Sequence, residues 1–249
     1  MKQNVYDNRK FFEGYKDLRE SGSGLNDALE QPAIRSLLPS LSGLDVLDLG
    51  CGMGQFAAAC ADDGVHVVVG VDISRKMLEY AQAHYADERI KYVHSAVEDV
   101  RFPDESFDLV VSSFVLHYVA DYATLVNHVY RWLRPGGQFI YSCEHPIITA
   151  QTPSGGQWIK DTEGRKLHWP VDSYGDESQR EQTWFIEGVV KYHRKLSTLV
   201  NGLVERGFRV EKLLEPEASD EAIAARPNLT AEWRRPPVLV VSVTKPEFT

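Results

Sequence analysis

The residues with the clearest chemical potential are three glycines at alternate positions, Gly50, Gly52 and Gly54. They directly follow the short apolar run Val46–Leu49, which contains Asp48 and is typical of a buried parallel strand. Glycine permits a tight turn and leaves main-chain N–H groups open to a ligand that a Cβ atom would screen. Because open α/β sheets bind ligands at the carboxyl ends of central strands, this stretch predicts a ligand-binding loop.

An acidic residue follows at a distance that suits a ribose contact. Asp72 ends a second β-branched run, Val65–Val71, about twenty positions beyond the glycines. A carboxylate in this place can accept hydrogen bonds from ribose hydroxyls. A dinucleotide fingerprint requires the spacing G-x-G-x-x-G, whereas this chain has G-x-G-x-G. The spacing therefore disfavours a nicotinamide-dependent oxidoreductase, for which the sequence also offers no obvious Tyr/Lys catalytic pair.

The same residues carry a family resemblance. With Asp48 the glycines form D-x-G-x-G-x-G, which closely resembles motif I of the class I S-adenosylmethionine (SAM)-dependent methyltransferases. Residues Phe107–Val119 are similar to motif IV of that family, and L-R-P-G-G-x-F at Leu133–Phe139 is a further similarity. These matches follow the family's order from residue 46 to 142. The chain looks most like its small-molecule, ubiquinone/menaquinone-biosynthesis-like group (methyltransferase type 11).

The resemblance implies an α/β fold with a Rossmann-like, seven-stranded, mostly parallel sheet, an antiparallel last strand and helices on both faces. It implies SAM as cofactor, S-adenosylhomocysteine as product and a small-molecule methyl acceptor. Main-chain carbonyls near Ser112 and Ser113 would then accept from the amino group of the cofactor. The expected cofactor-binding residues are Tyr15, Arg19, Asp48, Gly50, Cys51, Gly52, Gly54, Asp72, Ile73, Met77, Ala96, Val97, Glu98, Ser112, Ser113 and His117.

One of these positions departs from the family pattern. Ala96 stands where the family commonly has an aspartate near the adenine amino group. We therefore expect adenine to rely on the Val97 N–H and on apolar contacts from Ile73 and Met77, with Glu98 nearby. Alternatively, Met77 is a core residue that does not contact the cofactor. Cys51 is interpreted as a small residue that fills the turn rather than as a nucleophile.

The first 45 residues predict a helical cap. Phe11, Phe12, Tyr15 and Leu18 have helical spacing, and a Ser/Gly break at residues 21–24 precedes a second expected helix at 26–38. One interpretation is a lid across the cofactor site, with Tyr15 and Arg19 turned inward and Arg19 paired with the methionine carboxylate of SAM. The alternative is a capping helix with a solvated arginine.

The remaining chain divides into a core at 46–143, an insertion at 144–194 and a C-terminal part of the sheet at 195–249, all within one expected domain. Ser74 is expected to cap a helix that runs to about residue 86, and Asp121 one that runs to Trp132. Further strands are expected at 90–94, 107–111, 138–143, 208–214 and 238–244. A helix is expected at 195–206, with Gly207 as its C-cap.

The insertion is too long and too aromatic for a simple connection, so we expect a β-containing cover over the acceptor. A turn at Gly164 indicates a hairpin, and Thr183–Val190 indicates a strand. Hydrogen bonds within the cover are the alternative role for its polar groups. The candidate cover residues are Glu144, His145, Trp158, His168, Trp169, Tyr174, Tyr192 and His193.

The reaction implied by the resemblance is in-line displacement at the methyl group, which requires alignment and exclusion of water. An acidic acceptor would need a base, for which His117, His145 and His168 are the candidates, whereas a carboxylate or an unprotonated amine would need none. His117 could instead line the cleft. The residues Ser112–Val115 differ from the N-P-P-Y stretch of amide methyltransferases, and the clustered carboxylates of the metal-dependent catechol type are missing.

Bulk composition limits the partners. A net charge of −9 over 249 residues disfavours nucleic acid. No apolar run reaches membrane-spanning length, the N-terminus lacks a signal-peptide core, and three cysteines outside C-x-x-C spacing suggest a reducing cytoplasm and no zinc site. We expect a cytoplasmic monomer or homodimer. A SAM-binding protein without methyl transfer, regulatory or structural, is the alternative function.

Overall fold

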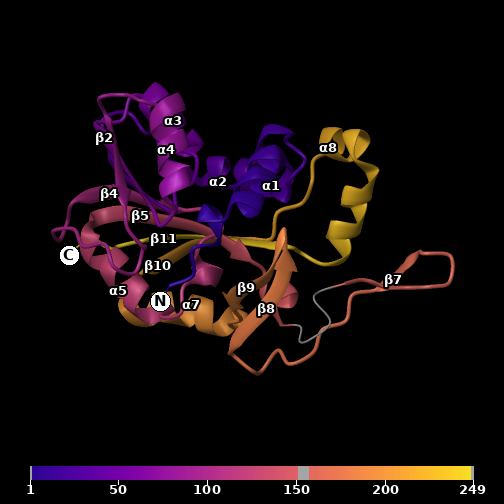
Figure 1. Ribbon diagram of the computed structural model, residues 1–249. Coiled ribbons are helices and arrows are strands. Elements are labelled where there is room, and N and C mark those ends of the chain that lie inside the picture. Colours follow the sequence, from indigo (N-terminus) through magenta and orange to yellow (C-terminus); the bar gives the residue numbers. More distant parts are fainter. Residues whose placement is uncertain (1, 151–156, 248–249) are drawn as a thin grey trace.

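A sheet of seven strands forms the centre of the computed structural model, which describes residues 2–150 and 157–247 (Figure 1). The strand order is β10-β11-β5-β4-β1-β2-β3. The strands are β1 Asp45–Leu49, β2 Val67–Asp72, β3 Ile90–His94, β4 Phe107–Ser112, β5 Leu133–Glu144, β10 Arg209–Leu214 and β11 Val238–Thr244. Strands β1 to β5 pair in parallel, and β11 runs antiparallel to both β5 and β10. The predicted Rossmann-like sheet with an antiparallel last strand is confirmed.

Helices cover both faces of this sheet, as Figure 1 shows. The main ones are α2 Gln31–Leu37, α3 Gln55–Asp62, α4 Arg75–His84, α5 Tyr122–Trp132 and α7 Leu196–Arg206. Alternation along each strand divides the core into two layers. Val46 and Ile140 pack in the layer with residues of α2 and α3, whereas Leu47 and Phe139 pack in the layer with residues of α5 and α7. Burial of these apolar side chains is the main stabilising contribution to the fold.

Local capping explains where the helices begin and end. The Ser74 hydroxyl accepts a hydrogen bond from the Met77 N–H (3.1 Å), and the Asp121 carboxylate accepts one from the Thr124 N–H (2.9 Å). Gly207 ends α7 with a φ of 105°, a conformation that favours glycine. Ser74, Asp121 and Gly207 therefore act as the caps that the sequence predicts, although α4 ends at His84 rather than near residue 86.

The N-terminal segment forms four short helical elements instead of the two helices that its hydrophobic pattern predicts. It contains a 3-10 turn, η1 Val5–Asp7, and then α1 Arg9–Glu20. The helix expected at 26–38 is a π-helical segment, η2 Asn26–Glu30, followed directly by α2. The wider π-helical turn ends at Glu30, a buried carboxylate that is held by hydrogen bonds to other elements.

The insertion after β5 contains a short helix and two hairpins. These are α6 Pro146–Thr149, the pair β6 Ile159–Lys160 and β7 Lys166–His168, and the pair β8 Gln179–Trp184 and β9 Ile186–Tyr192. Residues 151–156 of the insertion lie outside the described residues. The single strand expected at Thr183–Val190 is wrong, because Phe185 adopts a φ of 57° and turns the chain into the β8–β9 hairpin. The β6–β7 hairpin extends away from the sheet (Figure 1).

The polar connection between β10 and β11 also contains structure that its composition did not indicate. It forms α8 Asp220–Ala225 and η4 Pro227–Arg234. Arg226, between them, donates to the carbonyls of Ser23 and Gly24 and so joins this connection to the turn after α1. Among the described helices, none is long and apolar enough to cross a membrane.

Candidate active site

The glycine loop after β1 leaves open space at one of its three glycines. All three have positive φ values, 84° at Gly50, 52° at Gly52 and 84° at Gly54. A Cβ atom on Gly50 would clash with a methyl group of Val115, and one on Gly54 would lie 2.5 Å from the Tyr92 hydroxyl. A Cβ atom on Gly52 would meet no atom within 4 Å. Gly50 and Gly54 thus allow close packing, whereas Gly52 lines space that a ligand can use.

Asp72 at the end of β2 is fixed by the backbone on both sides. Its two carboxylate oxygens accept hydrogen bonds from the Gly52 N–H (2.9 Å) and the Ser74 N–H (2.8 Å). Burial raises the pKa of Asp72 to about 6, and the two backbone hydrogen bonds oppose this rise. The carboxylate is therefore mostly ionised at neutral pH and held in one orientation beside the glycine loop.

Asp48 supplies a buried oxygen that has no partner. Asp48 is 3% exposed, and its Oδ2 makes no hydrogen bond in the described part of the chain. Burial, and then the charges of Asp72 and Glu30, raise the pKa of Asp48 to about 8. A buried acceptor without a donor is costly, so this position suits a ligand that brings a donor or a positive charge.

Glu30 is a second buried carboxylate, which the sequence did not lead us to expect. Oε1 accepts hydrogen bonds from the hydroxyls of Ser113 (2.7 Å) and Ser142 (2.7 Å), and Oε2 accepts one from the Gln31 side chain (2.7 Å). Glu30 has no solvent exposure. A signal for it exists in the sequence, because Glu30 has helical spacing with the apolar residues Ala33, Ile34 and Leu37. A carboxylate on an apolar face indicates a buried polar contact.

Arg19 and Tyr15 are partly buried side chains of α1. Arg19 Nη1 lies 3.4 Å from Asp27 Oδ1 and, although buried, makes no hydrogen bond within the described residues. Burial raises the pKa of Tyr15 to about 12, and Asp72 and Glu30 are among the charges that act on it. The two side chains of α1 thus lie on the side of the helix that faces the carboxylates.

The first residues of the chain close over the loop that follows β2. Asp7 accepts hydrogen bonds from the Ser74 hydroxyl (2.7 Å) and the Lys76 N–H (3.1 Å), and Asn4 donates to the carbonyl of Ile73 (3.0 Å). The ring of Tyr6 packs edge-on against those of Tyr15 and Tyr118. These three tyrosines, Tyr6, Tyr15 and Tyr118, form an aromatic roof, and Asp72 is among the charges acting on two of them. Apart from Tyr15, its members were not predicted.

The residues expected near adenine are mostly buried. Met77, Ala96 and Val97 are 1%, 8% and 7% exposed, and Glu98 is partly exposed. The carbonyl of Ala96 accepts from the N–H groups of Asp99 and Val100, which makes a tight turn after β3. Met77 on α4 and Val97 in this turn are thus buried apolar residues on the segments that follow β2 and β3.

The end of β4 joins the glycine loop to the insertion. The Ser112 hydroxyl donates to the carbonyl of Leu49 (2.9 Å), while Ser113 donates to Glu30. His117 follows on the turn η3 Leu116–Tyr118, where Nδ1 accepts from the Glu144 N–H (3.3 Å). Burial lowers the pKa of His117 to about 3. His117 is therefore neutral, and its proton is on Nε2.

A small cavity lies between the end of β5 and the insertion. It is lined by Leu116, His117, Cys143, Glu144, Thr149, Tyr192, Arg194 and Leu199. Glu144 forms an ion pair with Lys191, whose ammonium group also lies over the rings of Tyr118 (5.8 Å) and Trp184 (5.7 Å). The Lys191 charge is the largest of the charges that lower the pKa of Glu144, against the effect of burial. The Glu144–Lys191 pair thus places two opposite charges beside the aromatic roof.

The other candidate bases occupy different surroundings. His145 caps α6, since Nδ1 accepts from the Ile147 N–H (3.1 Å), and Nε2 therefore donates to Glu215 (2.9 Å). Burial lowers the pKa of His145. His168 is exposed on the β6–β7 hairpin. The three histidines are thus not brought together at one place.

Trp158 and Trp169 form a separate cluster at the base of the β6–β7 hairpin. Their rings pack edge-on with centroids 5.5 Å apart, and Arg235 lies 3.9 Å from the ring centre of Trp169. The Trp169 indole donates to the carbonyl of Ile147 (3.3 Å). This cluster joins the hairpin to η4 and α6.

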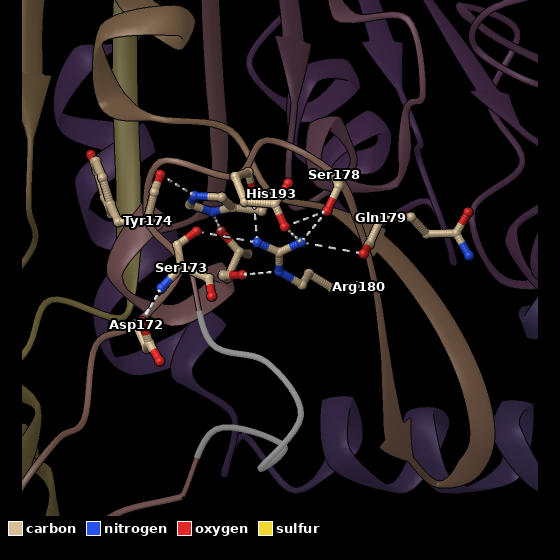
Figure 2. A network of polar contacts seen from close by, with 9 residues as sticks. Asp172, Ser173, Tyr174, Ser178, Gln179, Arg180 and His193 are labelled. Carbon is tan, nitrogen blue, oxygen red and sulfur yellow. Dashed lines mark hydrogen bonds and ion pairs between the residues drawn. The ribbon is translucent and has the colours of Figure 1, made fainter.

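Tyr174 and His193 take part in a buried polar network around Arg180 (Figure 2). The Arg180 guanidinium donates to the carbonyls of Thr149 (3.2 Å) and Asp176 (2.7 Å). His193 Nε2 donates to the carbonyl of Tyr174 (3.0 Å), so Nδ1 accepts from the Thr149 hydroxyl (2.7 Å). These hydrogen bonds hold α6, the 172–178 loop and the β8–β9 hairpin together.

The carboxyl ends of β1, β2 and β4 therefore meet the requirements of a nucleoside cofactor that carries a positive charge. The open position at Gly52 provides space, and the fixed Asp72 provides acceptors for hydroxyls. Asp48 Oδ2 and Arg19 Nη1 are both buried without a hydrogen-bond partner in the described residues. The first suits an ammonium group, and the second suits a carboxylate. These features fit SAM, and none of them depends on the insertion.

Comparisons with known proteins agree with this geometry. The family model described as Methyltransferase domain matches residues 47–141, which contain both Asp48 and Asp72. The chain is 43% identical to a solved structure of an S-adenosylmethionine-dependent methyltransferase from Mesorhizobium loti, which superimposes with a TM-score of 0.82 over 89% of this chain and 100% of that one.

Two curated relatives extend the comparison. An uncharacterized protein from Haemophilus influenzae is 34% identical over 99% of this chain and 98% of its own length. A demethylmenaquinone methyltransferase from Clavibacter sepedonicus is 38% identical over 48% of each chain. The similarity thus reaches beyond the matched domain for the first relative and covers about half of the second.

Proposed function

Since the chain belongs to the class I SAM-dependent methyltransferases of the type 11 group, we propose that it methylates a small molecule by in-line displacement at the carboxyl ends of β1, β2 and β4. The single observation that carries the placement of the site is the Asp72 carboxylate, fixed by the N–H groups of Gly52 and Ser74 beside open space. SAM is the cofactor.

We assign the cofactor contacts to groups whose geometry suits them. Asp72 binds the ribose hydroxyls, and Gly52 gives the cofactor access to the loop backbone. Arg19 pairs with the methionine carboxylate, because its buried Nη1 makes no hydrogen bond within the described residues. Asp48 accepts from the ammonium group, which supplies the donor that Oδ2 lacks. Met77, Ile73 and the turn at Ala96–Glu98 surround adenine.

When bound, SAM supplies a methyl group that is already activated by the positive charge on sulfur. The protein therefore has to align the acceptor and exclude water rather than activate a leaving group. The aromatic roof of Tyr6, Tyr15 and Tyr118 and the docking of Asp7 on Ser74 serve to close the site.

The acceptor approaches from the side of the Glu144–Lys191 pair. We propose that its nucleophile is already unprotonated at neutral pH, such as a carboxylate or an amine with a low pKa. The contacts of the histidines support this, because Nδ1 of His117 and both ring nitrogens of His145 take part in hydrogen bonds and burial lowers both pKa values.

A screen with methyl-labelled SAM tests the proposal. Carboxylic acids, amines and phenols are each incubated with the enzyme, and labelled product is separated from SAM. We expect transfer to at least one carboxylic acid or amine, and the Asp72→Ala variant should lose it. Binding of SAM without transfer to any class would favour the alternative of a binding protein. Transfer to phenols alone, with a pH dependence near neutrality, would contradict the proposal that no base is used.

A further inference from the structure

The first helical elements of the chain contact two regions that lie far apart in the sequence. Residues 2–20, which include η1 and α1, are named the N-terminal arm. One of the two regions is the loop after β2, which follows Asp72, the carboxylate that binds ribose in the proposed function. The other region is the β8–β9 hairpin of the insertion. The arm is therefore a direct link between the cofactor side and the insertion.

Polar side chains hold the N-terminal arm on the cofactor side. The Asn4 amide donates to the carbonyl of Ile73 (3.0 Å), and Asp7 accepts from the Ser74 hydroxyl (2.7 Å). The Ser74 N–H donates in turn to Asp72 (2.8 Å). Ser74 thus joins Asp7 of the arm to the carboxylate of the proposed ribose site. A ligand that immobilises Asp72 therefore also immobilises this end of the arm.

Gln3 holds the N-terminal arm against the edge of β9. Its Nε2 donates to the carbonyl of Gly188 (2.9 Å), and its Oε1 accepts from the Val190 N–H (3.0 Å). Because β9 pairs with β8 alone among the described strands, the amide of Gln3 takes the place of a neighbouring strand at this edge. Val189, between the two contacts, is fully buried in one apolar cluster with Val5 of the arm. Apolar packing therefore supports the two hydrogen bonds of Gln3.

The contact between α1 and the tip of the hairpin includes two locally unfavourable features. Gly14 lies in the middle of α1, where glycine is less favourable than alanine, but a Cβ atom there would lie 2.7 Å from the Phe185 ring. Phe185 has a φ of 57°, which residues other than glycine rarely adopt. The ring of Phe11 packs edge-on against those of Trp184 and Phe185, with centroids 5.2 and 5.4 Å apart. Both unfavourable features occur at one contact, which indicates that α1 and the hairpin are fitted to each other.

The strand that Gln3 holds also carries Lys191. The Lys191 ammonium pairs with Glu144 at the end of β5 and lies over the ring of Tyr118 (5.8 Å). In the proposed function the acceptor approaches from the side of this pair. A segment that is fixed at both ends couples the groups at its ends, because a ligand that orders one end lowers the entropic cost of ordering the other. Cofactor binding at Asp72 is thus expected to order β9 through the N-terminal arm.

We propose that Asp7 and Gln3 are positioning residues, through which the bound cofactor fixes β9 and the Glu144–Lys191 pair for the acceptor. This inference rests on the proposed function, because it connects the two sides of that site. Asp7 acts through the loop that follows Asp72, and Gln3 acts through the backbone of β9. The consequence is an order of binding, in which the cofactor enters first and completes the acceptor side.

Hydrogen exchange measured by mass spectrometry, with and without saturating S-adenosylhomocysteine, tests this coupling. The product serves as the probe because it binds without turnover. In the unmodified protein we expect it to slow exchange by at least about fivefold, both in residues 72–78 and in β9. In the Gln3→Ala variant it should still slow exchange in residues 72–78 but no longer in β9. A merely structural role of Gln3 would speed exchange in β9 equally with and without the ligand.

Two further variants separate the coupling from local damage. Gln179→Ala makes the same change at an exposed position of β8 and should keep the full effect of the ligand on β9. Asp7→Ala breaks the opposite end of the N-terminal arm, because it removes the acceptor for the Ser74 hydroxyl, and should abolish the effect on β9. Calorimetric titration of each variant sets the ligand concentration that saturates it, so that a change in affinity does not imitate a loss of coupling.

The outcomes distinguish the positioning role from the proposed function. Loss of the ligand effect on β9 in Gln3→Ala and Asp7→Ala, with the effect kept in Gln179→Ala, supports the positioning role. Equal slowing of β9 in Gln3→Ala and in the unmodified protein overturns it, as does ligand binding without any slowing of β9. Each of these results leaves the proposed function intact, because the ligand still binds. Failure of the unmodified protein to bind S-adenosylhomocysteine overturns the proposed function and this inference together.

Discussion

The glycine loop and the insertion both follow the carboxyl ends of parallel strands, β1 and β5, but the polar groups around them have different partners. Beside the loop, Asp72 at the end of β2 is oriented by main-chain N–H groups, and Oδ2 of Asp48 in β1 has no hydrogen-bond partner in the described chain. In the insertion, Arg180 and His193 make hydrogen bonds to nearby carbonyls and hydroxyls, and Glu144 pairs with Lys191.

The polar groups beside the glycine loop are therefore available to a ligand, whereas those of the insertion hold the protein's own segments together. A buried polar atom without a partner indicates that a ligand supplies one, whereas a satisfied network indicates rigidity. The cofactor end of the site therefore has unmet hydrogen-bonding capacity that a ligand must fill. In our proposal, the insertion offers an acceptor the Glu144–Lys191 ion pair, which lies next to Tyr118 of the aromatic roof.

The largest expected effect is at Gly52. The Gly52→Val variant places a branched side chain into the open space of the loop and should reduce SAM affinity by more than about 100-fold. Gly43→Val is a matched control, because Gly43 also has a positive φ (77°) and a Cβ atom there would likewise meet no atom within 4 Å. Both variants should lose similar thermal stability, and only Gly52→Val should lose binding by calorimetry. Equal SAM affinity in the two would show that the loop is not the site.

The Asp72→Ala variant should have the next largest effect. It removes the acceptors for the ribose and leaves the N–H groups of Gly52 and Ser74 without partners, so SAM affinity should fall about 30- to 100-fold. The product should lose affinity equally, because its ribose is the same. Titration of both ligands measures this, and unchanged affinity would remove Asp72 from the site.

The pH dependence of the free energy of unfolding tests whether Asp48 and Asp72 have raised pKa values in the folded protein. The folded-state pKa values of Asp72, about 6, and Asp48, about 8, lie above the ordinary value of 3.8. The folded protein therefore holds more protons than the unfolded chain between pH 4 and pH 8, and its free energy of unfolding should fall as pH rises through this range, by at most about 1.4 kcal/mol per pH unit for each group.

Chemical denaturation at several pH values checks this dependence. Asp48→Asn should flatten the upper part of the range, between pH 6 and pH 8, and SAM should stabilise the unmodified protein most at the alkaline end. A free energy of unfolding that rises with pH in this range, without ligand, would contradict the burial of these acids.

A smaller effect is expected at His117. Because Nδ1 accepts from the Glu144 N–H and burial lowers the pKa to about 3, His117 should remain neutral above pH 5. Nitrogen-15 NMR should show a protonated Nε2 and no titration between pH 5 and pH 8. In a methyl-transfer assay, His117→Asn, which keeps an acceptor for that N–H, should retain activity within about tenfold, whereas a general base would contribute 10²–10⁴-fold.

The smallest effect is expected at Cys51. Burial raises the pKa of its thiol well above the ordinary value, so it should react slowly with iodoacetamide at pH 8. Cys51→Ala should change SAM affinity less than about threefold. Rapid alkylation that blocks SAM binding would instead indicate an accessible thiol at the loop.

The sequence was sufficient for those features that depend on local pattern. The seven strands, the caps at Ser74, Asp121 and Gly207, and the glycine loop follow from periodicity and residue type within short windows. The orientation of Asp72 depends on Ser74, two residues later, and on Gly52, which the parallel pairing of β1 with β2 brings close. The spacing predicted that Asp72 stands near the glycine loop, but not that Gly52 and Ser74 donate to it.

The features that the sequence did not indicate depend on contacts between distant segments. Glu30 is held by Ser113 and Ser142, and the aromatic roof joins Tyr6 and Tyr15 to Tyr118. The hairpin turn at Phe185 uses a positive φ without glycine, so no turn signal marks it. The residue type made His145 a candidate base, but its hydrogen bond from the Ile147 N–H shows that it caps α6.

Calorimetric titration of the unmodified protein with SAM, S-adenosylhomocysteine and NADH tests the central claim most directly. We predict micromolar binding of SAM and S-adenosylhomocysteine and no binding of NADH, because the G-x-G-x-G spacing differs from the dinucleotide fingerprint G-x-G-x-x-G. A folded protein that binds neither SAM nor its product would contradict the assignment of the cofactor site.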